Sequence, residues 1–369
     1  MRLVALAGGI LTALVLPVAA HASTTKLVYM GEPPKTSNTF EQKYSSDVND
    51  YFPHSSMIHV GDSLKFQSTS FHTVDLPARG QHILAFILPS GPTPSGVNDQ
   101  AGQPFWFNGQ VKEFGFNPLL GKVTKKATYD GSKRVESGVF EGNGPPPPLV
   151  VKFTKPGTYT FHCDIHPGMI GKVKVVAASK KIPTANQDAT AVQRQVAADL
   201  ASAKTVGHTV APAGTVLVGA GGKGHIEYYG YFGPTAPISV GTTLTFQMGK
   251  GSLEVHTATT DKDASAAPPP APGPGSDQIP SIYLAGLANT FQGSGPFNPI
   301  ATYPSDQAGG TPASLTPSTH GNGFWNTGVL DNISASPVPS NNSVRFDPAG
   351  TYTFYCLIHN FMHITIKVQ

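Results

Sequence analysis

Apolar and polar residues alternate in the same way along two short stretches of the chain. Residues 157–161 and 350–354 both read Gly-Thr-Tyr-Thr-Phe, and a cysteine follows two positions after each phenylalanine. Successive side chains of a strand point to opposite faces, so the aromatic residues and the cysteine share one face. These faces hold Tyr159, Phe161 and Cys163 in the first copy, and Tyr352, Phe354 and Cys356 in the second. The pattern predicts two strands that direct a cysteine into a hydrophobic core.

The resemblance between the two halves extends beyond these strands. Three further pairs of segments match: residues 58–66 and 238–246, 116–118 and 297–299, and 137–139 and 327–329. The chain has 369 residues, only 13% of them charged, and is rich in glycine (40) and proline (34). This composition favours a loop-rich, all-β fold. We predict two Greek-key β-sandwich domains, residues 23–178 and 207–369, produced by duplication.

One segment has a different character. Residues 184–201 are rich in alanine and glutamine, contain no glycine or proline, and follow Pro183. Val192, Val196 and Leu200 recur at intervals of four residues, the spacing of one helix face. We therefore predict a helix over residues 184–204, within a linker of residues 179–206, lying against one of the domains.

The N-terminal residues have the pattern of a secretory signal peptide, predicted as residues 1–22. Arg2 precedes an apolar run to Ala20, and Ala20-His21-Ala22 fits a small-x-small cleavage site. An uncleaved membrane anchor is the alternative, because the run approaches the length that spans a bilayer. No later apolar stretch reaches 18 residues. We expect a secreted or periplasmic (cell-envelope) protein with no membrane span after cleavage.

The candidate chemistry follows the two alternating strands. Cys-x-x-His-x-x-Met occurs twice, and the copies lie 193 positions apart, from 163 to 356. These are the only two cysteines, and a disulfide between them would leave the matching histidine and methionine spacings without a role. The candidate ligands are Cys163, His166 and Met169 in the first copy, and Cys356, His359 and Met362 in the second. Each half also offers an upstream histidine followed by threonine, His72 and His256.

Thiolate, imidazole and thioether ligands favour copper. Two histidines and one cysteine with a long axial methionine form the type 1, or blue, copper site. A methionine ligand argues against structural zinc, and iron–sulfur clusters need more cysteines than each half contains. Such a site leaves no position open for a substrate and suits one-electron transfer. Nucleic acid is not an expected partner, because the net charge is only +3 and basic runs are absent.

Each half resembles the cupredoxin family, which includes plastocyanin and amicyanin. The residues that carry the resemblance are His-Thr after a Val-Gly-x-x-Leu-x-Phe strand, and Gly-Thr-Tyr-Thr-Phe-x-Cys-x-x-His-x-x-Met. The resemblance implies one copper site at His72, Cys163, His166 and Met169, and another at His256, Cys356, His359 and Met362. It also implies that each loop histidine is an exposed electron port. The apolar patches around these ports would include Pro167, Gly168, Ile170 and Phe361.

Three other functions use related folds or ligands. Multicopper oxidases need His-x-His pairs, and this chain contains none. Copper nitrite reductases resemble it at His162 and Asp75, but Pro77 stands where that family has a copper-binding histidine. They also lack a complete blue site in the second half. Copper storage or delivery would use the same ligands and stays open. We predict an electron carrier, not an enzyme, that serves an unidentified redox partner protein.

The long segments between each upstream histidine and its cysteine contain two proline-rich tracts, Pro145–Pro148 and Ala266–Gly275. Tracts of this composition favour exposed polyproline segments over strands. We expect them to decorate the surface.

Overall fold

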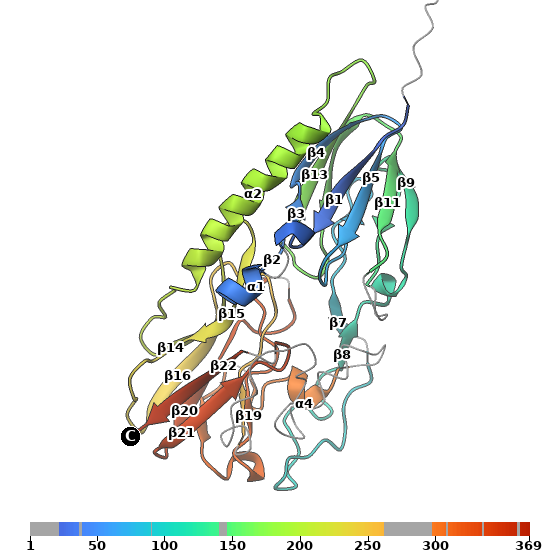
Figure 1. Cartoon of the computed structure of the whole chain (residues 1–369). Helices are drawn as coiled ribbons and strands as arrows, with labels where there is room; N and C mark the ends of the chain where they lie inside the picture. Colours follow the sequence, from blue (N-terminus) through green and yellow to red (C-terminus); the bar gives the residue numbers. More distant parts are fainter. Residues whose placement is uncertain are drawn as a thin grey trace, which may run out of the picture.

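The protein is built from two stacked pairs of β-sheets, shown one above the other in Figure 1. This computed structural model describes residues 22–36, 39–89, 91–139, 146–261, 297–307, 309–333, 336–359 and 362–369. Strands make up most of the regular structure in these residues. The all-β fold class predicted from the sequence is confirmed, and its strands form two β-sandwiches.

The first sandwich consists of two sheets, each with five strands among the described residues. One sheet has the order β3 (Tyr51–Phe52), β1 (Thr25–Met30), β5 (Ser63–Ser68), β11 (Leu149–Phe153) and β9 (Lys126–Tyr129). The other has the order β10 (Val135–Glu136), β6 (Asp75–Leu76), β12 (Gly157–His162), β13 (Ile170–Val176) and β4 (Ser55–His59). Their facing side chains form one buried core, which includes Phe66, Phe161 and Cys163.

The second sandwich repeats this plan with different edges. One sheet has the order β18 (Ala313–Leu315), β20 (Asn341–Phe346), β16 (Thr242–Met248), β14 (Thr215–Gly221), β15 (Ile226–Phe232) and β2 (Ser46–Val48). The other has the order β19 (Trp325–Asn326), β17 (Thr259–Thr260), β21 (Gly350–Tyr355) and β22 (His363–Val368). Strand β2 precedes most of the first sandwich in sequence, yet it pairs antiparallel with β15 of the second.

The alternating stretches form the strands that the sequence predicts. β12 pairs with β13 through residues 157–162, and β21 pairs with β22 through residues 350–355. Cys163 and Cys356 follow directly and are almost completely buried within the two cores. The prediction that both cysteines point into a core is confirmed.

The repeated short segments have the same structural roles in both halves. Asn117 and Asn298 cap short helices, η2 (Pro118–Gly121) and α4 (Pro299–Thr302), by accepting from the backbone two residues later. Ser137 and Thr327 each use a hydroxyl to accept from the backbone N–H two residues after an upstream histidine. The repeats seen in the sequence therefore stabilise equivalent turns.

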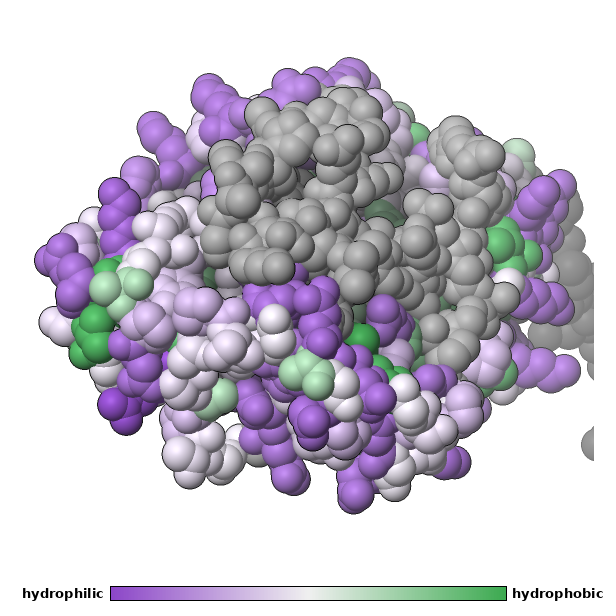
Figure 2. All heavy atoms as spheres, turned by 90° about the horizontal axis from the view of Figure 1, so that it is seen from below, coloured by the Kyte–Doolittle hydropathy of each residue, from purple (hydrophilic) through white to green (hydrophobic). Residues whose placement is uncertain are grey.

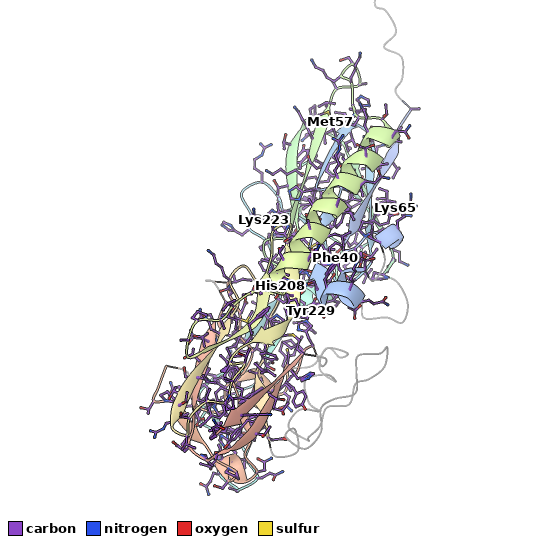
Figure 3. All side chains as sticks on the ribbon, turned by 60° about the vertical axis from the view of Figure 1, so that its left-hand side comes forward. Phe40, Met57, Lys65, His208, Lys223 and Tyr229 are labelled. Carbon is purple, nitrogen blue, oxygen red and sulfur yellow. The ribbon has the colours of Figure 1, made fainter. Side chains whose placement is uncertain are left out.

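The predicted helix is present as α2, Ala185–Val206, and it runs alongside both sandwiches in Figure 1. Thr184 and Gln187 form a capping box at its start. Its apolar face packs with the short α1 (Thr39–Tyr44) and β15, and Phe40 lies beside it in Figure 3. Its role as a linker, like the exact domain boundaries, stays a prediction.

The long segment between β6 and β9 is not merely decoration. It contains the hairpin of β7 (Ile87–Pro89) and β8 (Phe114–Phe116) and contributes Phe105, Phe107 and Phe114 to an aromatic cluster. The other buried members of this cluster come from the second half, including Phe297, Tyr303 and Phe324. A few loop residues of one half thus help to cover the other, because their large rings need a buried surface.

The expectation of exposed proline tracts is wrong for the part of the first tract that the structure describes. Pro146–Pro148 are partly buried, and the carbonyl of Pro146 accepts from the side chain of Gln67. Pro145 and the tract Ala266–Gly275 lie outside the described residues, as do residues 1–21 of the predicted signal peptide. The remaining short helices are η1 (Pro34–Thr36) and η3 (Thr319–Gly321).

The described surface is mainly polar on the face seen in Figure 2, with small, separate apolar areas. Among the described residues, no helix is both long and apolar enough to cross a membrane.

Candidate metal centres

The first centre brings together three side chains from distant parts of the chain. His72 lies between β5 and β6, Cys163 follows β12, and His166 lies in the loop that leads to β13. One nitrogen or sulfur atom from each lies within 4.8 Å of the others. The two Nδ1 atoms are 2.9 Å apart, and Nδ1 of His166 is 3.5 Å from the sulfur of Cys163. All three side chains are buried.

The second centre has the same arrangement. His256, Cys356 and His359 also place one donor atom each within 4.8 Å of the others. The Nδ1 atoms of the two histidines are 3.0 Å apart, and they lie 3.9 and 3.8 Å from the sulfur of Cys356. The structure therefore brings together the two predicted sets of histidine and cysteine residues.

The predicted methionines, Met169 and Met362, are at most 1% exposed and belong to the same cores as the cysteines. Their backbones close the ligand loops. The N–H of Cys163 donates to the carbonyl of Met169, whose own N–H donates to the carbonyl of His166. Cys356, Met362 and His359 make the same two bonds. Each loop is thus a tight turn that presents histidine and cysteine side chains to one point.

A threonine after each upstream histidine supports the cysteine. The backbone N–H groups of Thr73 and Thr257 donate to the sulfur atoms of Cys163 and Cys356 at 3.3 and 3.4 Å. Their hydroxyls accept from the backbone N–H of the residue that follows each cysteine. The His-Thr pairs in the sequence therefore mark both a candidate ligand and a sulfur-binding support. Such bonds orient a ligand and tune the electronic properties of a metal.

The neighbouring imidazoles favour the thiolate form of both cysteines. Burial alone would raise the pKa of Cys163, but the charge and hydrogen bonds of His166 and His72 lower it well below its ordinary value. At Cys356 burial again opposes ionisation, and hydrogen bonds from His256 and His359 lower the thiol pKa. The thiolate is the form of cysteine that binds metals.

Two glutamates contact the outer nitrogens of these histidines, and the sequence analysis did not identify them. Glu254 Oε1 lies 2.9 Å from Nε2 of His166, and Glu227 Oε1 lies 3.2 Å from Nε2 of His256. Burial opposes the imidazolium form of His166, but the charges of Glu254 and Cys163 raise its pKa well above the usual value. Neither glutamate belongs to a repeated motif, so the local sequence offered no signal for them.

The expectation of an exposed loop histidine is wrong for the first centre. His166 is only 3% exposed, and Glu254 of the second half contacts its Nε2. A Cβ atom added at Gly168 would lie 2.8 Å from the Leu253 side chain, so this part of the patch is closely covered. His359 is less buried. Phe361, predicted to surround it, lies outside the described residues.

A third cluster lies beside the first centre and consists of carboxylates. Asp75, Glu136 and Asp164 place one oxygen each within 4.8 Å of the others, and Arg134 pairs with Asp75. Burial and the Asp164 charge raise the pKa of Asp75 to about 7. His162 lies opposite Asp75 in the pairing of β12 with β6. Asp75 therefore belongs to a buried acidic network with an arginine partner.

Comparison with solved structures finds similarity to amicyanins. A copper(I) form of one amicyanin mutant is 16% identical, with a TM-score of 0.20, and the match covers 41% of this chain and 81% of that chain. A reduced amicyanin mutant matches with 16% identity and a TM-score of 0.21, over 42% of this chain and 87% of that one. No protein-family model matches the chain. No curated protein matches it either.

Proposed function

We propose that the protein is a tandem cupredoxin that transfers single electrons through two type 1 copper sites. The observation that carries the proposal is the duplicated centre, in which two Nδ1 atoms and one cysteine sulfur converge in a buried pocket. The proposed ligands are His72, Cys163, His166 and Met169, and His256, Cys356, His359 and Met362.

The donor set fits copper on chemical grounds. At both centres two unprotonated imidazole nitrogens and a thiolate can share one soft cation, and a buried methionine supplies a thioether in the same core. In the first centre the two Nδ1 atoms lie 2.9 Å apart, so at least one of them is unprotonated and offers a lone pair toward the other donors. Copper bound there would supply one-electron redox chemistry.

The surroundings favour electron transfer over catalysis. Both sulfurs accept backbone hydrogen bonds, and apolar side chains enclose them, so the ligands keep one geometry in either oxidation state. A rigid, dry site needs little rearrangement when the metal charge changes. The protein would keep the ligand side chains in place, exclude water from the metal and exchange electrons with a redox partner protein. We propose that this exchange takes place in the periplasm or outside the cell.

Burial also bears on the alternative of copper storage or delivery. A delivery protein must pass its metal to an accepting ligand, whereas Cys163 and Cys356 are at most 1% exposed. The nitrite reductase alternative gains no support from Asp75, which pairs with Arg134 and faces other carboxylates. We therefore propose a carrier and expect no nitrite reduction with an artificial electron donor.

The direct test is copper stoichiometry combined with the visible spectrum. The mature protein should bind two copper ions, and Cu(II) should produce an intense thiolate-to-copper absorption toward the red end of the visible range. C163S and C356S should each lose one copper and part of the colour. One copper per chain, or a colour unchanged in either variant, would contradict the proposal.

A further inference from the structure

A single carboxylate lies between the two candidate metal centres. Glu254 follows β16 in the second sandwich, two residues before His256. Its Oε1 is 2.9 Å from Nε2 of His166, and its Oε2 is 3.9 Å from Nε2 of His359. The two oxygens of one side chain thus face the loop histidines of both centres.

The carboxylate is held in a built site. Its side chain is only 9% exposed. Asn49 donates from Nδ2 to Oε1 at 3.2 Å, and the hydroxyl of Tyr229 donates to the same oxygen at 3.3 Å. The ring of Tyr229 also stacks on His359 with centroids 4.6 Å apart. Figure 3 shows Tyr229 where the upper and lower parts of the molecule meet.

The position of Glu254 is a property of one half only. The residue two positions before His72 is Ser70, which cannot supply a second bridging carboxylate. The other glutamate near a ligand, Glu227, contacts His256 and also accepts from Ser252 and Leu253, all within the second half. Glu227 therefore serves one centre, whereas Glu254 reaches both.

The chemistry of histidine gives this placement a consequence. A histidine that binds a metal through Nδ1 carries its remaining proton on Nε2, and a carboxylate that accepts this proton orients the ring and strengthens the ligand. At both centres the Nδ1 atom of the loop histidine faces the cysteine sulfur. Nε2 of His166 lies within hydrogen-bond distance of Glu254, and Nε2 of His359 lies at the ion-pair distance of 3.9 Å from it.

We propose that Glu254 is a positioning residue shared by both centres, which makes them one coupled unit instead of two independent sites. This inference rests on the proposed copper-binding function. The negative charge stabilises the more positive, oxidised state of a metal at either centre. The path His166–Glu254–His359 also connects the two ligand sets through three side chains.

The test compares Glu254→Gln with Glu227→Gln, each combined separately with C163S and C356S so that one centre is observed at a time. Glu254→Gln keeps the shape but removes the charge, so the reduction potential should shift upward at both centres. Glu227→Gln is the matched control and should shift only the second centre. A shift at one centre only, or at neither, with Glu254→Gln would overturn the proposal.

A second readout needs no copper. In the metal-free protein, nitrogen-15 NMR should show changed Nε2 signals of both His166 and His359 in Glu254→Gln, and smaller changes in Tyr229→Phe. Unchanged signals at either histidine in Glu254→Gln would overturn the shared role. If the wild-type protein binds no copper, the electron-transfer proposal is refuted. The shared role of the carboxylate would still hold if Glu254→Gln changes the Nε2 signals of both histidines.

Discussion

The outer ring nitrogens of the four histidines have different surroundings. Those of His166 and His256 face glutamates, whereas Nε2 of His72 is buried without a hydrogen-bond partner among the described residues. Close packing holds that ring, since a Cβ added at Gly31 would lie 2.8 Å from its Nε2. Gly219 packs in the same way against His256, at 2.5 Å. Glycine at these two positions therefore makes space for a ligand ring.

Gly31→Ala should selectively damage the first centre. Gly31 has φ +86° and Gly219 has φ +69°, where a side chain costs roughly 1–2 kcal/mol even without the contact to histidine. We expect Gly31→Ala to reduce copper binding and colour at the first centre, and Gly219→Ala to do so at the second. Copper titration of both variants measures this. Full, tight loading of both sites in either variant would show that the glycines do not set the ring positions.

Met169→Leu should raise the reduction potential of the first centre and leave its copper in place. A long axial sulfur contact adds little affinity but donates charge to the oxidised metal. Met362→Leu is the matched change and should affect mainly the second centre. Redox titration with visible absorption separates the two. Loss of copper from Met169→Leu, or two unmoved potentials, would mean that Met169 is not an axial ligand.

At the scale of elements, α2 carries a buried carboxyl group. Asp199 lies on the inner face of the helix, and its Oδ2 has no hydrogen-bond partner among the described residues. Burial and the nearby Asp50 charge raise the pKa of Asp199 to about 7, although His54 opposes this. A buried carboxyl with a raised pKa stabilises the fold only while it keeps its proton.

Asp199→Asn should therefore stabilise the protein above neutral pH. In the wild type, the contribution of protonated Asp199 to the free energy of unfolding is complete below the pKa of the unfolded state, near 4. This contribution declines as the pH rises and is lost once the pH exceeds about 7. The asparagine variant should have a higher Tm at pH 8 and little difference at pH 4. Each kcal/mol gained corresponds to about 2–4 °C. Thermal unfolding of both proteins at pH values from 4 to 8 measures this difference in Tm. An equal difference at pH 4 and pH 8 would mean that packing, and not ionisation of Asp199, causes it.

At the scale of the whole molecule, the described residues of the two halves meet at several places. Strand β2 extends the sheet of the second sandwich, and Glu254 contacts His166 of the first. The indole of Trp106 donates to the carbonyl of Pro304 at 2.7 Å, beside the shared aromatic cluster. Because both centres depend on this junction, we expect their stabilities to be linked.

The metal-free protein should unfold in one cooperative transition. Calorimetry should give equal calorimetric and van't Hoff enthalpies, the signature of a two-state change. Trp106→Ala removes the hydrogen bond and ring contacts to Tyr303, and should lower the midpoint by several degrees. Two separate transitions in the wild type would show that the sandwiches are energetically independent.

Local spacing was sufficient for the parts of the protein that depend on neighbours in sequence. The alternation before Cys163 and Cys356 predicts two strands with buried sulfurs, because side-chain direction follows directly from strand geometry. The same holds for the capped helix α2. The upstream histidines were identifiable only because their strand context occurs twice.

Tertiary structure alone decided how the halves meet. Glu254 is 88 positions from His166, and β2 pairs with a strand far along the chain. No periodicity or repeat in the sequence indicates either contact, because both contacts depend on how the two sandwiches are placed relative to each other. The burial of His166 follows from that placement. The sequence therefore determined two candidate copper-binding sets, and only the fold brought their loop histidines to one carboxylate.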